Sequence, residues 1–326
     1  MFFEILILIV SLTALIWSAD KFVFGAAAIA RNFGIAPMVI GLTIVAMGSS
    51  APEMLVAVTA SMNDAPDTAI GNVIGSNITN IALVLGLTAL FKPLMVSSIT
   101  IKREIPLLLV VTAIASWMLY DLNFTSTEGW VLLIGFVIFI VTLLIVTIKR
   151  NKDKPASDPM LMEAEQEIPS GVKSSHAIFW LIVGMILLPL SSHFLVGSAT
   201  FIAQEFGISD LVIGLTIIAI GTSLPELAAS IMSLVKKEDD LALGNIIGSN
   251  LFNTLAVLAL PGLIAPGVVD SDVASRDIPY MMALTLLLFF LCFSRKGQFR
   301  ITRVKGVVLF IAFIIYQYLI FSQIAA

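Results

Sequence analysis

Residues 41–53 read GLTIVAMGSSAPE, and residues 214–226 repeat this pattern as GLTIIAIGTSLPE. Each copy is an apolar run that ends in glycine and hydroxyl residues, followed by a proline and a glutamate. The two glutamates, Glu53 and Glu226, are 173 residues apart, and the same offset aligns residues 34–80 with residues 207–253 without a gap. Of these 47 aligned positions 22 are identical, which indicates an internal duplication.

The composition predicts a membrane protein. Of the 326 residues 59% are hydrophobic and 12% are charged, and the mean hydropathy is +1.04. Soluble globular proteins have roughly 25% charged residues, so this chain has too few charges to cover a soluble surface. Cys292 is the single cysteine of the sequence, which excludes an intrachain disulfide framework.

Ten segments are long and apolar enough to cross a bilayer, whose core takes roughly 20 residues of helix. They lie at 3–25, 37–61, 67–91, 104–120, 127–148, 177–203, 209–235, 241–264, 275–294 and 304–322. The first has no basic region and no small-residue cleavage site before Ser18, so we interpret it as a membrane span and not as a removed signal. The sequence therefore predicts an all-α polytopic membrane protein, with five spans in residues 1–148, a cytoplasmic linker at 149–175 and five spans in residues 176–326.

The basic residues predict the orientation of these spans. With the amino terminus outside, 16 of the 18 lysines and arginines fall in cytoplasmic connections, as the positive-inside rule requires. We therefore expect both termini on the extracytoplasmic side. Because five is an odd number, the second half then enters the membrane in the opposite direction, and the duplication is an inverted repeat. Such a repeat would place the two copied motifs face to face near the midplane.

A proline is expected to break the helix in each motif. Proline lacks an N–H donor and its ring crowds the carbonyl four residues earlier, so Pro52 would free the carbonyl of Gly48, and Pro225 that of Gly221. Within a membrane a freed carbonyl is tolerated where it is buried in protein or lines a wet cavity. The two breaks should therefore face the interior of the protein.

Hydroxyl groups flank the glutamate of each motif. On a helix, Ser49 and Ser50 lie one turn before Glu53, so both hydroxyls are expected near its carboxylate. The second motif has the same arrangement in Thr222, Ser223 and Glu226.

The segment after each motif supplies further polar groups. Residues 71–80 read GNVIGSNITN and residues 244–253 read GNIIGSNLFN. A spacing of four residues puts their polar side chains on one helix face. The glycine pairs within them predict close contact with a neighbouring helix. The polar residues are Asn72, Ser76 and Asn80 in the first copy and Asn245, Ser249 and Asn253 in the second, and the glycine pairs are Gly71 with Gly75 and Gly244 with Gly248.

Together these groups favour a hard cation. Two carboxylates, several hydroxyls, amide oxygens and freed carbonyls would meet, and Ca²⁺ takes about 6 to 8 oxygen ligands at roughly 2.3 to 2.6 Å. Softer metals such as zinc or copper prefer cysteine and histidine ligands, which do not accompany the motifs.

The paired sequences GSSAPE and GTSLPE, each followed by GN(V/I)IGSN, resemble the two alpha repeats of the sodium/calcium exchanger family of cation/calcium antiporters. The repeats would occupy residues 34–91 and 207–264, and the resemblance extends over nearly the whole chain. It implies a prokaryotic-type member in the plasma (inner) membrane, without a regulatory calcium-binding domain. It further implies an antiporter that trades Na⁺ for Ca²⁺ by alternating access, with spans 1 and 6 sliding across the other helices.

The resemblance also implies a set of ion ligands. Glu53 and Glu226 would be the principal ligands shared by Ca²⁺ and Na⁺. The other implied ligands are the hydroxyls of Ser50, Ser223, Ser76 and Ser249, further oxygens of Ser49 and Thr222, the backbone carbonyls of Ala46 and Ala219, and the amide of Asn80. Well-studied members have an aspartate where this chain has Asn253, so its candidate site contains two carboxylates and two asparagines. Asn253 leaves open whether Na⁺ or H⁺ is the counter-ion, and K⁺ co-transport is open too.

Two other functional classes could use the same pair of glutamates. A cation channel could use the two glutamates as a selectivity filter, although channels usually depend on oligomeric symmetry around a continuous pore. An intramembrane acid protease could use them as a catalytic dyad, although glutamates in proline-broken helices are unlike the aspartates of that chemistry. We expect a transporter and no enzyme, with no cofactor, no nucleic-acid partner and no obligate protein partner, surrounded by the lipid bilayer.

Overall fold

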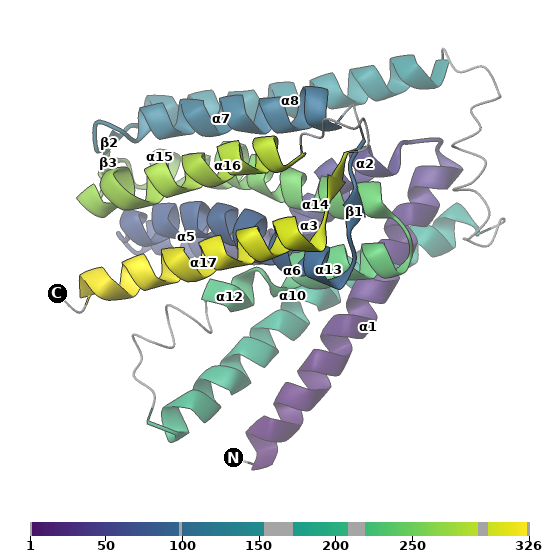
Figure 1. The fold of residues 1–326 in the computed structure, drawn as a ribbon, viewed down its shortest axis with the longest axis horizontal. Coiled ribbons are helices and arrows are strands. Elements are labelled where there is room, and N and C mark those ends of the chain that lie inside the picture. The colour runs from purple at the N-terminus through teal and green to yellow at the C-terminus, as the bar shows by residue number, and fades with distance from the viewer. Residues whose placement is uncertain (1, 98–99, 153–171, 208–218, 293–298, 325–326) are drawn as a thin grey trace.

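The chain folds into a bundle of helices with four two-residue strands among the residues described by the computed structural model (Figure 1). These residues are 2–97, 100–152, 172–207, 219–292 and 299–324. The seventh expected span, 209–235, therefore lies partly outside the described residues, as does most of the expected linker at 149–175.

The first half of the chain contains one long helix, a broken helix and several shorter ones, with π-helical turns labelled η. Its elements are α1 (Phe2–Asn32), α2 (Pro37–Ile40), η1 (Gly41–Val45), α3 (Ala46–Ser49), α4 (Ala51–Met62), α5 (Pro66–Thr79), η2 (Asn80–Val84), α6 (Leu85–Phe91), β1 (Leu94–Met95), η3 (Thr100–Glu104), α7 (Ile105–Met118), β2 (Asn123–Phe124) and α8 (Ser126–Lys152).

The second half repeats this order where it is described. Its elements are α10 (Ser174–Glu205), α12 (Ala219–Thr222), α13 (Leu224–Val235), α14 (Asp239–Phe252), η5 (Asn253–Val257), α15 (Ala259–Ile264), β3 (Gly267–Val268), η6 (Val273–Asp277), α16 (Ile278–Cys292), β4 (Arg300–Ile301) and α17 (Arg303–Ile324). The ends of the expected linker are helical, because α8 continues to Lys152 and α10 begins at Ser174.

The sequence duplication is also visible in the element boundaries. α13 begins and ends 173 residues after α4, α14 does so after α5, and η5 after η2. Gly34 and Gly207, which are separated by the same offset, both have positive φ after the long first helix of their half. Glycine adopts this conformation without steric cost, which explains its use at both turns.

The strands pair one half of the chain with the other. β1 of the first half is antiparallel to β4 of the second, and β2 is antiparallel to β3. Both pairs therefore connect segments that are far apart in the sequence, and they fix how the two halves pack.

Seven helices in the described part of the chain are long and apolar enough to span a membrane. The pair 37–49 and 51–62 passes the same test as one span bent by 48°, and α13 is a shorter apolar helix. All seven helices and the bent pair coincide with expected spans. The remaining expected spans are 104–120, where the 14-residue α7 lies, and 209–235. The structure thus supports an all-α membrane protein.

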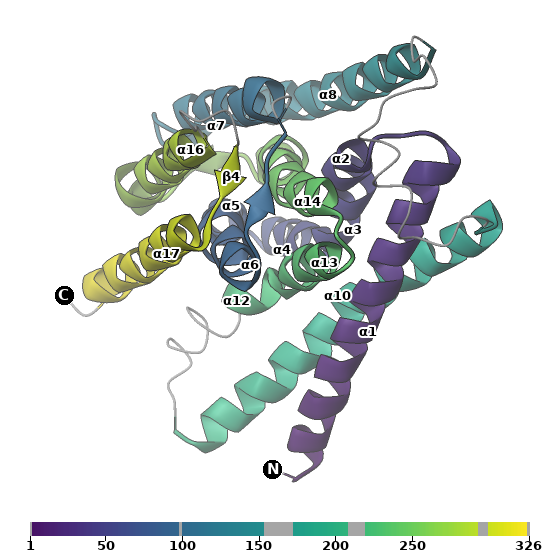
Figure 2. The same cartoon turned by 45° about the vertical axis from the view of Figure 1, so that its right-hand side comes forward.

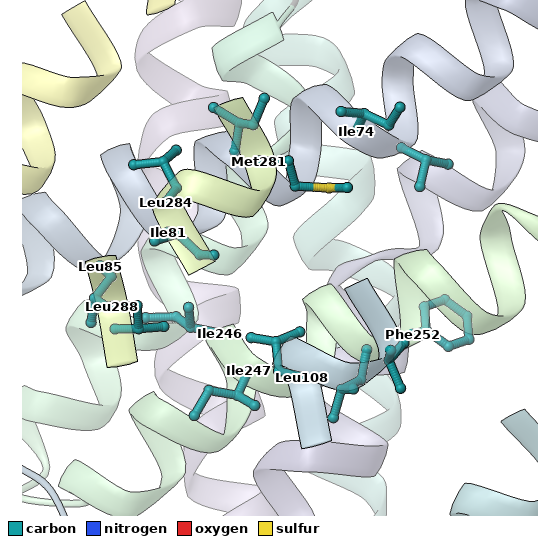
Figure 3. Close-up of a cluster of buried hydrophobic side chains, with 14 of the residues drawn as sticks. Ile74, Ile81, Leu85, Leu108, Ile246, Ile247, Phe252, Met281, Leu284 and Leu288 are labelled. Atoms are coloured by element: carbon teal, nitrogen blue, oxygen red, sulfur yellow. The ribbon is translucent and has the colours of Figure 1, made fainter. Parts of the chain in front are cut away.

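The two α5–α6 and α14–α15 segments form the centre of the bundle. In the most apolar 18-residue stretch of each, 83% of the first and 89% of the second is buried, whereas the corresponding share in α1, α8, α10 and α17 is 17 to 28%. Figure 3 shows the apolar cluster around them, in which Ile74 and Ile246 lie among side chains of α7 and α16. The exposed apolar surface of the outer helices is the surface that lipid would cover.

The long helices α1 and α10 pack against each other and cross in Figure 2, and in Figure 1 they run obliquely to α7, α8, α16 and α17. Glycines allow this contact. A Cβ atom at Gly25 would lie 2.5 Å from the backbone nitrogen of Leu181, and one at Gly184 would lie 2.5 Å from the Cβ of Phe22.

Two further glycines place α14 against the first motif. A Cβ at Gly244 would lie 2.7 Å from the carbonyl oxygen of Met38, and one at Gly248 would lie 2.6 Å from the Cα of Leu42. The predicted close helix contact is therefore present for this pair. At Gly71 and Gly75 no described atom lies within 4 Å of such a Cβ, and the segment at the corresponding position, 211–218, lies outside the described residues.

Candidate cation site

The predicted helix breaks are present at matching positions. Ser50 separates α3 from α4 with φ −84° and ψ 16°, and Ser223 separates α12 from α13 with φ −92° and ψ 6°. Pro52 and Pro225 lie in the first turn of the helix that follows, where the missing N–H of proline needs no helical acceptor. Each motif therefore ends one short helix and begins another at the position of its glutamate.

A side chain of α10 satisfies one of the freed carbonyls. The hydroxyl of Ser192 donates a hydrogen bond of 2.7 Å to the carbonyl oxygen of Gly221, and both residues are buried. Ala19 occupies the position of Ser192 in the first half, so this bond has no counterpart at Gly48. The break in the second motif is thus tied to one of the two oblique helices.

The two glutamates are completely buried. Glu53 lies in the first turn of α4 and Glu226 in the first turn of α13, each with 0% exposure. Helix amino termini favour negative charge, which suits a carboxylate at either position. The two carboxylates are close enough to repel each other, and neither has an ion-pair partner among the described residues. Two such buried negative charges are costly without a compensating cation.

The serine hydroxyls, which were expected near the Glu53 carboxylate, donate hydrogen bonds to the other half of the chain, and among the described residues neither bonds to that carboxylate. Ser50 Oγ donates to Glu226 Oε1 at 2.8 Å, and Ser49 Oγ donates to Asn245 Oδ1 at 3.1 Å. The expectation assumed a continuous helix, in which residues three or four apart share a face. The break at Ser50 ends that geometry, and both hydroxyls bond residues of the second half, Glu226 in its motif and Asn245 in α14.

Asn80 and Asn253 each stand at the first position of a π-helical turn, η2 or η5, in the middle of the bundle. Both are 0% exposed, and neither amide oxygen nor amide nitrogen has a hydrogen-bond partner among the described residues. Short π-helical turns inside α-helices occur frequently at functional sites, because the widened turn redirects a side chain.

The site contains eight buried polar atoms that find no partner in the described part of the chain. They are both carboxylate oxygens of Glu53, Oε2 of Glu226, Oγ of Ser223, and the amide oxygens and nitrogens of Asn80 and Asn253. Buried polar groups in native proteins are nearly always paired, so a cluster of unpaired ones requires an explanation. Six of the eight atoms are oxygens, which is the ligand type that Ca²⁺ and Na⁺ prefer.

The other expected ligands lie on α3, α5, α12 and α14, next to the helix breaks or on the helices that carry the asparagines. Ser76 lies beside the Glu53 carboxylate without a hydrogen bond to it, and Ser249 Oγ is 3.5 Å from Ser49 Oγ. Ala46 begins α3, Thr222 is half-buried at the end of α12, and Ala219 begins α12, with its side chain outside the description. No group of three or more histidine, cysteine, aspartate and glutamate side chains converges within the described ranges.

Two asparagines hold the backbone of the glutamates. Asn72 Nδ2 donates to the carbonyl oxygen of Glu53 at 3.3 Å, and Asn245 Nδ2 donates to that of Glu226 at 3.2 Å. The sequence predicts both asparagines on the helix face of the site, but it indicates no hydrogen-bond partner for either. Their spacing of 19 residues from the glutamates was the signal that could have suggested this contact.

The model of the sodium/calcium exchanger protein family matches residues 3–145 and 176–322. The chain belongs to this family. It is 55% identical over 315 residues to CaxA of Alkalimonas amylolytica, which is named as an antiporter on a provisional basis, with 97% of this chain and 98% of CaxA covered. It is also 42% identical over 292 residues to the inner membrane protein YrbG of Escherichia coli, with 90% and 89% covered.

A solved structure of the sodium-calcium exchanger NCX_Mj, soaked with Na⁺ and Sr²⁺, superimposes on the chain with a TM-score of 0.80 at 32% identity, covering 96% of this chain and 97% of that one. The family is a transporter family and not an enzyme family. Family and fold together support antiport of Ca²⁺ against another cation in a membrane.

Proposed function

We propose that this chain exchanges Ca²⁺ for Na⁺ across the membrane by alternating access, with the ions bound between the two motifs. One observation carries the proposal: several buried oxygens near the two helix breaks have no partner among the described residues, including both carboxylate oxygens of Glu53 and Oε2 of Glu226. Two negative charges balance one Ca²⁺. The same oxygens suit Na⁺, so the two ions would compete for one site, and such competition is the basis of antiport.

The ligand set of this proposal follows the matched motifs. Ca²⁺ would be held by Glu53 and Glu226, with hydroxyl and carbonyl oxygens completing its shell. The remaining ligands would come from Ser50, Ser223, Ser76, Ser249, Ser49, Thr222, Asn80, Asn253 and the backbone carbonyls of Ala46 and Ala219.

The topology in this proposal is an inverted repeat of ten spans, with residues 1–148 and 176–326 as its halves and both termini outside the inner membrane of a prokaryote. The shared offset of element boundaries and the strand pairing between halves support it. The packing of α1 on α10, oblique to the other helices, supports the sliding of these two helices across the bundle.

Flux into liposomes tests the proposal. Purified protein is reconstituted with Na⁺ inside, and ⁴⁵Ca²⁺ uptake is measured, then repeated with K⁺ or a proton gradient in place of Na⁺. We expect uptake driven by internal Na⁺ alone. Uptake without any counter-ion gradient would indicate a channel and contradict antiport.

Proton-coupled Ca²⁺ antiport is the second candidate, and Asn253 favours it. A site with two carboxylates offers less negative charge to load several Na⁺ ions than one with three, because each uncompensated charge in a low-dielectric cavity is costly. Both glutamates are buried without a cationic partner among the described residues, so each could carry a proton between Ca²⁺ cycles. Uptake against a proton gradient alone would select this candidate.

Asn253→Asp adds a third carboxylate to the site, and we expect it to change the coupling ratio or the pH dependence of transport. The reason is that Asn253 is fully buried and neither of its amide atoms has a partner in the described part of the chain, so a charge there would act directly on the bound ions. The reversal potential of exchange and its pH profile measure the effect. An unchanged reversal potential and pH profile would show that residue 253 does not contact the ions.

A further inference from the structure

Asn245 lies at the junction of the two motifs and makes three hydrogen bonds there. It is 0% exposed in α14, one helical turn before Ser249. Its Nδ2 donates to the Glu226 carbonyl at 3.2 Å and to Ser230 Oγ at 3.0 Å, and its Oδ1 accepts the hydroxyl of Ser49 at 3.1 Å. Both donor hydrogens of the amide are therefore used, and the amide orientation follows from these partners.

The bond to Ser49 determines which side of that hydroxyl faces the site. A hydroxyl has one hydrogen and two lone pairs, so an oxygen that coordinates a cation must give its hydrogen to another acceptor. Ser49 Oγ has three possible acceptors in reach, and the shortest of the three distances is to Asn245 Oδ1 at 3.1 Å, against 3.3 Å to the Ala46 carbonyl and 3.5 Å to Ser249 Oγ. A bond to Asn245 leaves the Ala46 carbonyl available as a cation ligand as well.

The first half has only part of this arrangement. Asn72 bonds the Glu53 carbonyl at 3.3 Å but is only half-buried, and Ala57 stands where the second half has Ser230. Among the described residues the side chain of Asn72 has this one bond. The two asparagines therefore match in their contact with the glutamate backbone, and Asn245 alone extends to a candidate ligand.

We propose that Asn245 is a positioning residue of the cation site, which holds the backbone of Glu226 and turns the oxygen of Ser49 toward the ion. This inference rests on the proposed function, because it assumes that Ca²⁺ binds between the motifs. Asn245 contributes to Ca²⁺ affinity through Ser49 and has no contact with the ion. One half of the site is thereby oriented by a residue of the other half.

A double-mutant cycle tests this role. Equilibrium ⁴⁵Ca²⁺ binding is measured for the wild type, Asn245→Ala, Ser49→Ala and the double variant. Asn245→Ala should weaken Ca²⁺ binding on the order of tenfold, as expected for the loss of one hydrogen-bonding group in a buried network. The Ca²⁺ affinity of the double variant should lie within about twofold of that of the weaker-binding single variant, because the effects of residues that act through one another are not additive.

Two variants serve as controls. Asn72→Ala removes the matching hydrogen bond to the Glu53 carbonyl, but Asn72 has no bond to a candidate ligand. This variant should weaken Ca²⁺ binding by less than about threefold. Asn245→Leu fills the volume of the asparagine without its hydrogen bonds, and it replaces Asn245→Ala if the alanine variant does not fold. It should weaken Ca²⁺ binding by the same order of tenfold. The melting temperature without Ca²⁺ shows the purely structural effect of each change.

The outcomes separate the inference from the proposed function. Fully additive losses, or unchanged Ca²⁺ affinity in Asn245→Ala and Asn245→Leu, would overturn the positioning role while wild-type binding leaves the proposed function intact. Absence of ⁴⁵Ca²⁺ binding to the wild type would overturn both.

Discussion

We expect Glu53→Gln and Glu226→Gln each to abolish Ca²⁺ transport while the protein remains folded in the membrane. Glutamine keeps the size of the side chain but removes its charge, and the loss of one partner of a buried charged contact costs about 3 to 5 kcal/mol, or more than about a hundredfold in affinity. The measurement is ⁴⁵Ca²⁺ uptake into proteoliposomes, with elution from a sizing column as the check on folding.

Stability gives an independent readout of the same change. The wild type should melt at a higher temperature when Ca²⁺ is added, because a ligand that binds the folded state alone stabilises it. We expect Ca²⁺ to have no such effect on either glutamine variant. Glu205→Gln, an exposed residue at the end of α10, is the matched control and should transport like the wild type. Full transport by Glu53→Gln or Glu226→Gln would remove that residue from the ligand set.

Gly248→Ala should destabilise the protein by about 1 to 3 kcal/mol, the usual cost of an extra carbon in a well-packed interior. The added Cβ would lie 2.6 Å from the Cα of Leu42 and 2.8 Å from both the Leu42 carbonyl oxygen and the Cβ of Ala46. Two of these atoms belong to the backbone, so α14 must move away from the first motif. The midpoint of thermal unfolding in detergent measures this effect.

Gly135→Ala is the control for this substitution. Among the described residues its Cβ would meet the end of the Leu255 side chain alone, at 3.4 Å, which is ordinary contact. The control should melt near the wild type, because alanine also favours the helix. If Gly248→Ala has the same melting temperature as the control, α14 and the first motif are not in the tight contact described. Because Ala46 is also a candidate ligand, Gly248→Ala should weaken Ca²⁺ binding as well.

Much of the fold could be predicted from the sequence because it depends on local composition. The apolar segments 67–91 and 241–264 agree within two residues with the helical segments 66–91 and 239–264. The first helix continues to Asn32, seven residues beyond the expected end at 25, because residues 26–30 read AAAIA and alanine has the highest helix propensity. The strand pairs β1–β4 and β2–β3 have no sequence signal, since two-residue strands are too short for an alternating pattern.

The sequence indicates which residues would form the candidate site, and that set remains a prediction, but it does not indicate the contacts between them. Duplication and proline placement led to Glu53, Glu226 and the helix breaks. The bonds from Ser50 to Glu226 and from Ser192 to Gly221 connect residues far apart in the sequence, so spacing along a single helix could not indicate them. The π-helical turns that begin at Asn80 and Asn253 were also missed, because a π turn arises from packing and has no residue preference strong enough to read.

The central claim is that one Ca²⁺ binds between the two motif glutamates in competition with Na⁺. The most direct measurement is equilibrium binding of ⁴⁵Ca²⁺ to the purified protein, titrated with Na⁺ at constant ionic strength, for the wild type and the Glu53→Gln, Glu226→Gln double variant. We predict one bound Ca²⁺ per wild-type chain, displaced by Na⁺ and not by an equal concentration of choline, and none bound by the double variant. Equal Ca²⁺ binding by both proteins, or binding that Na⁺ and choline reduce equally, would contradict the account.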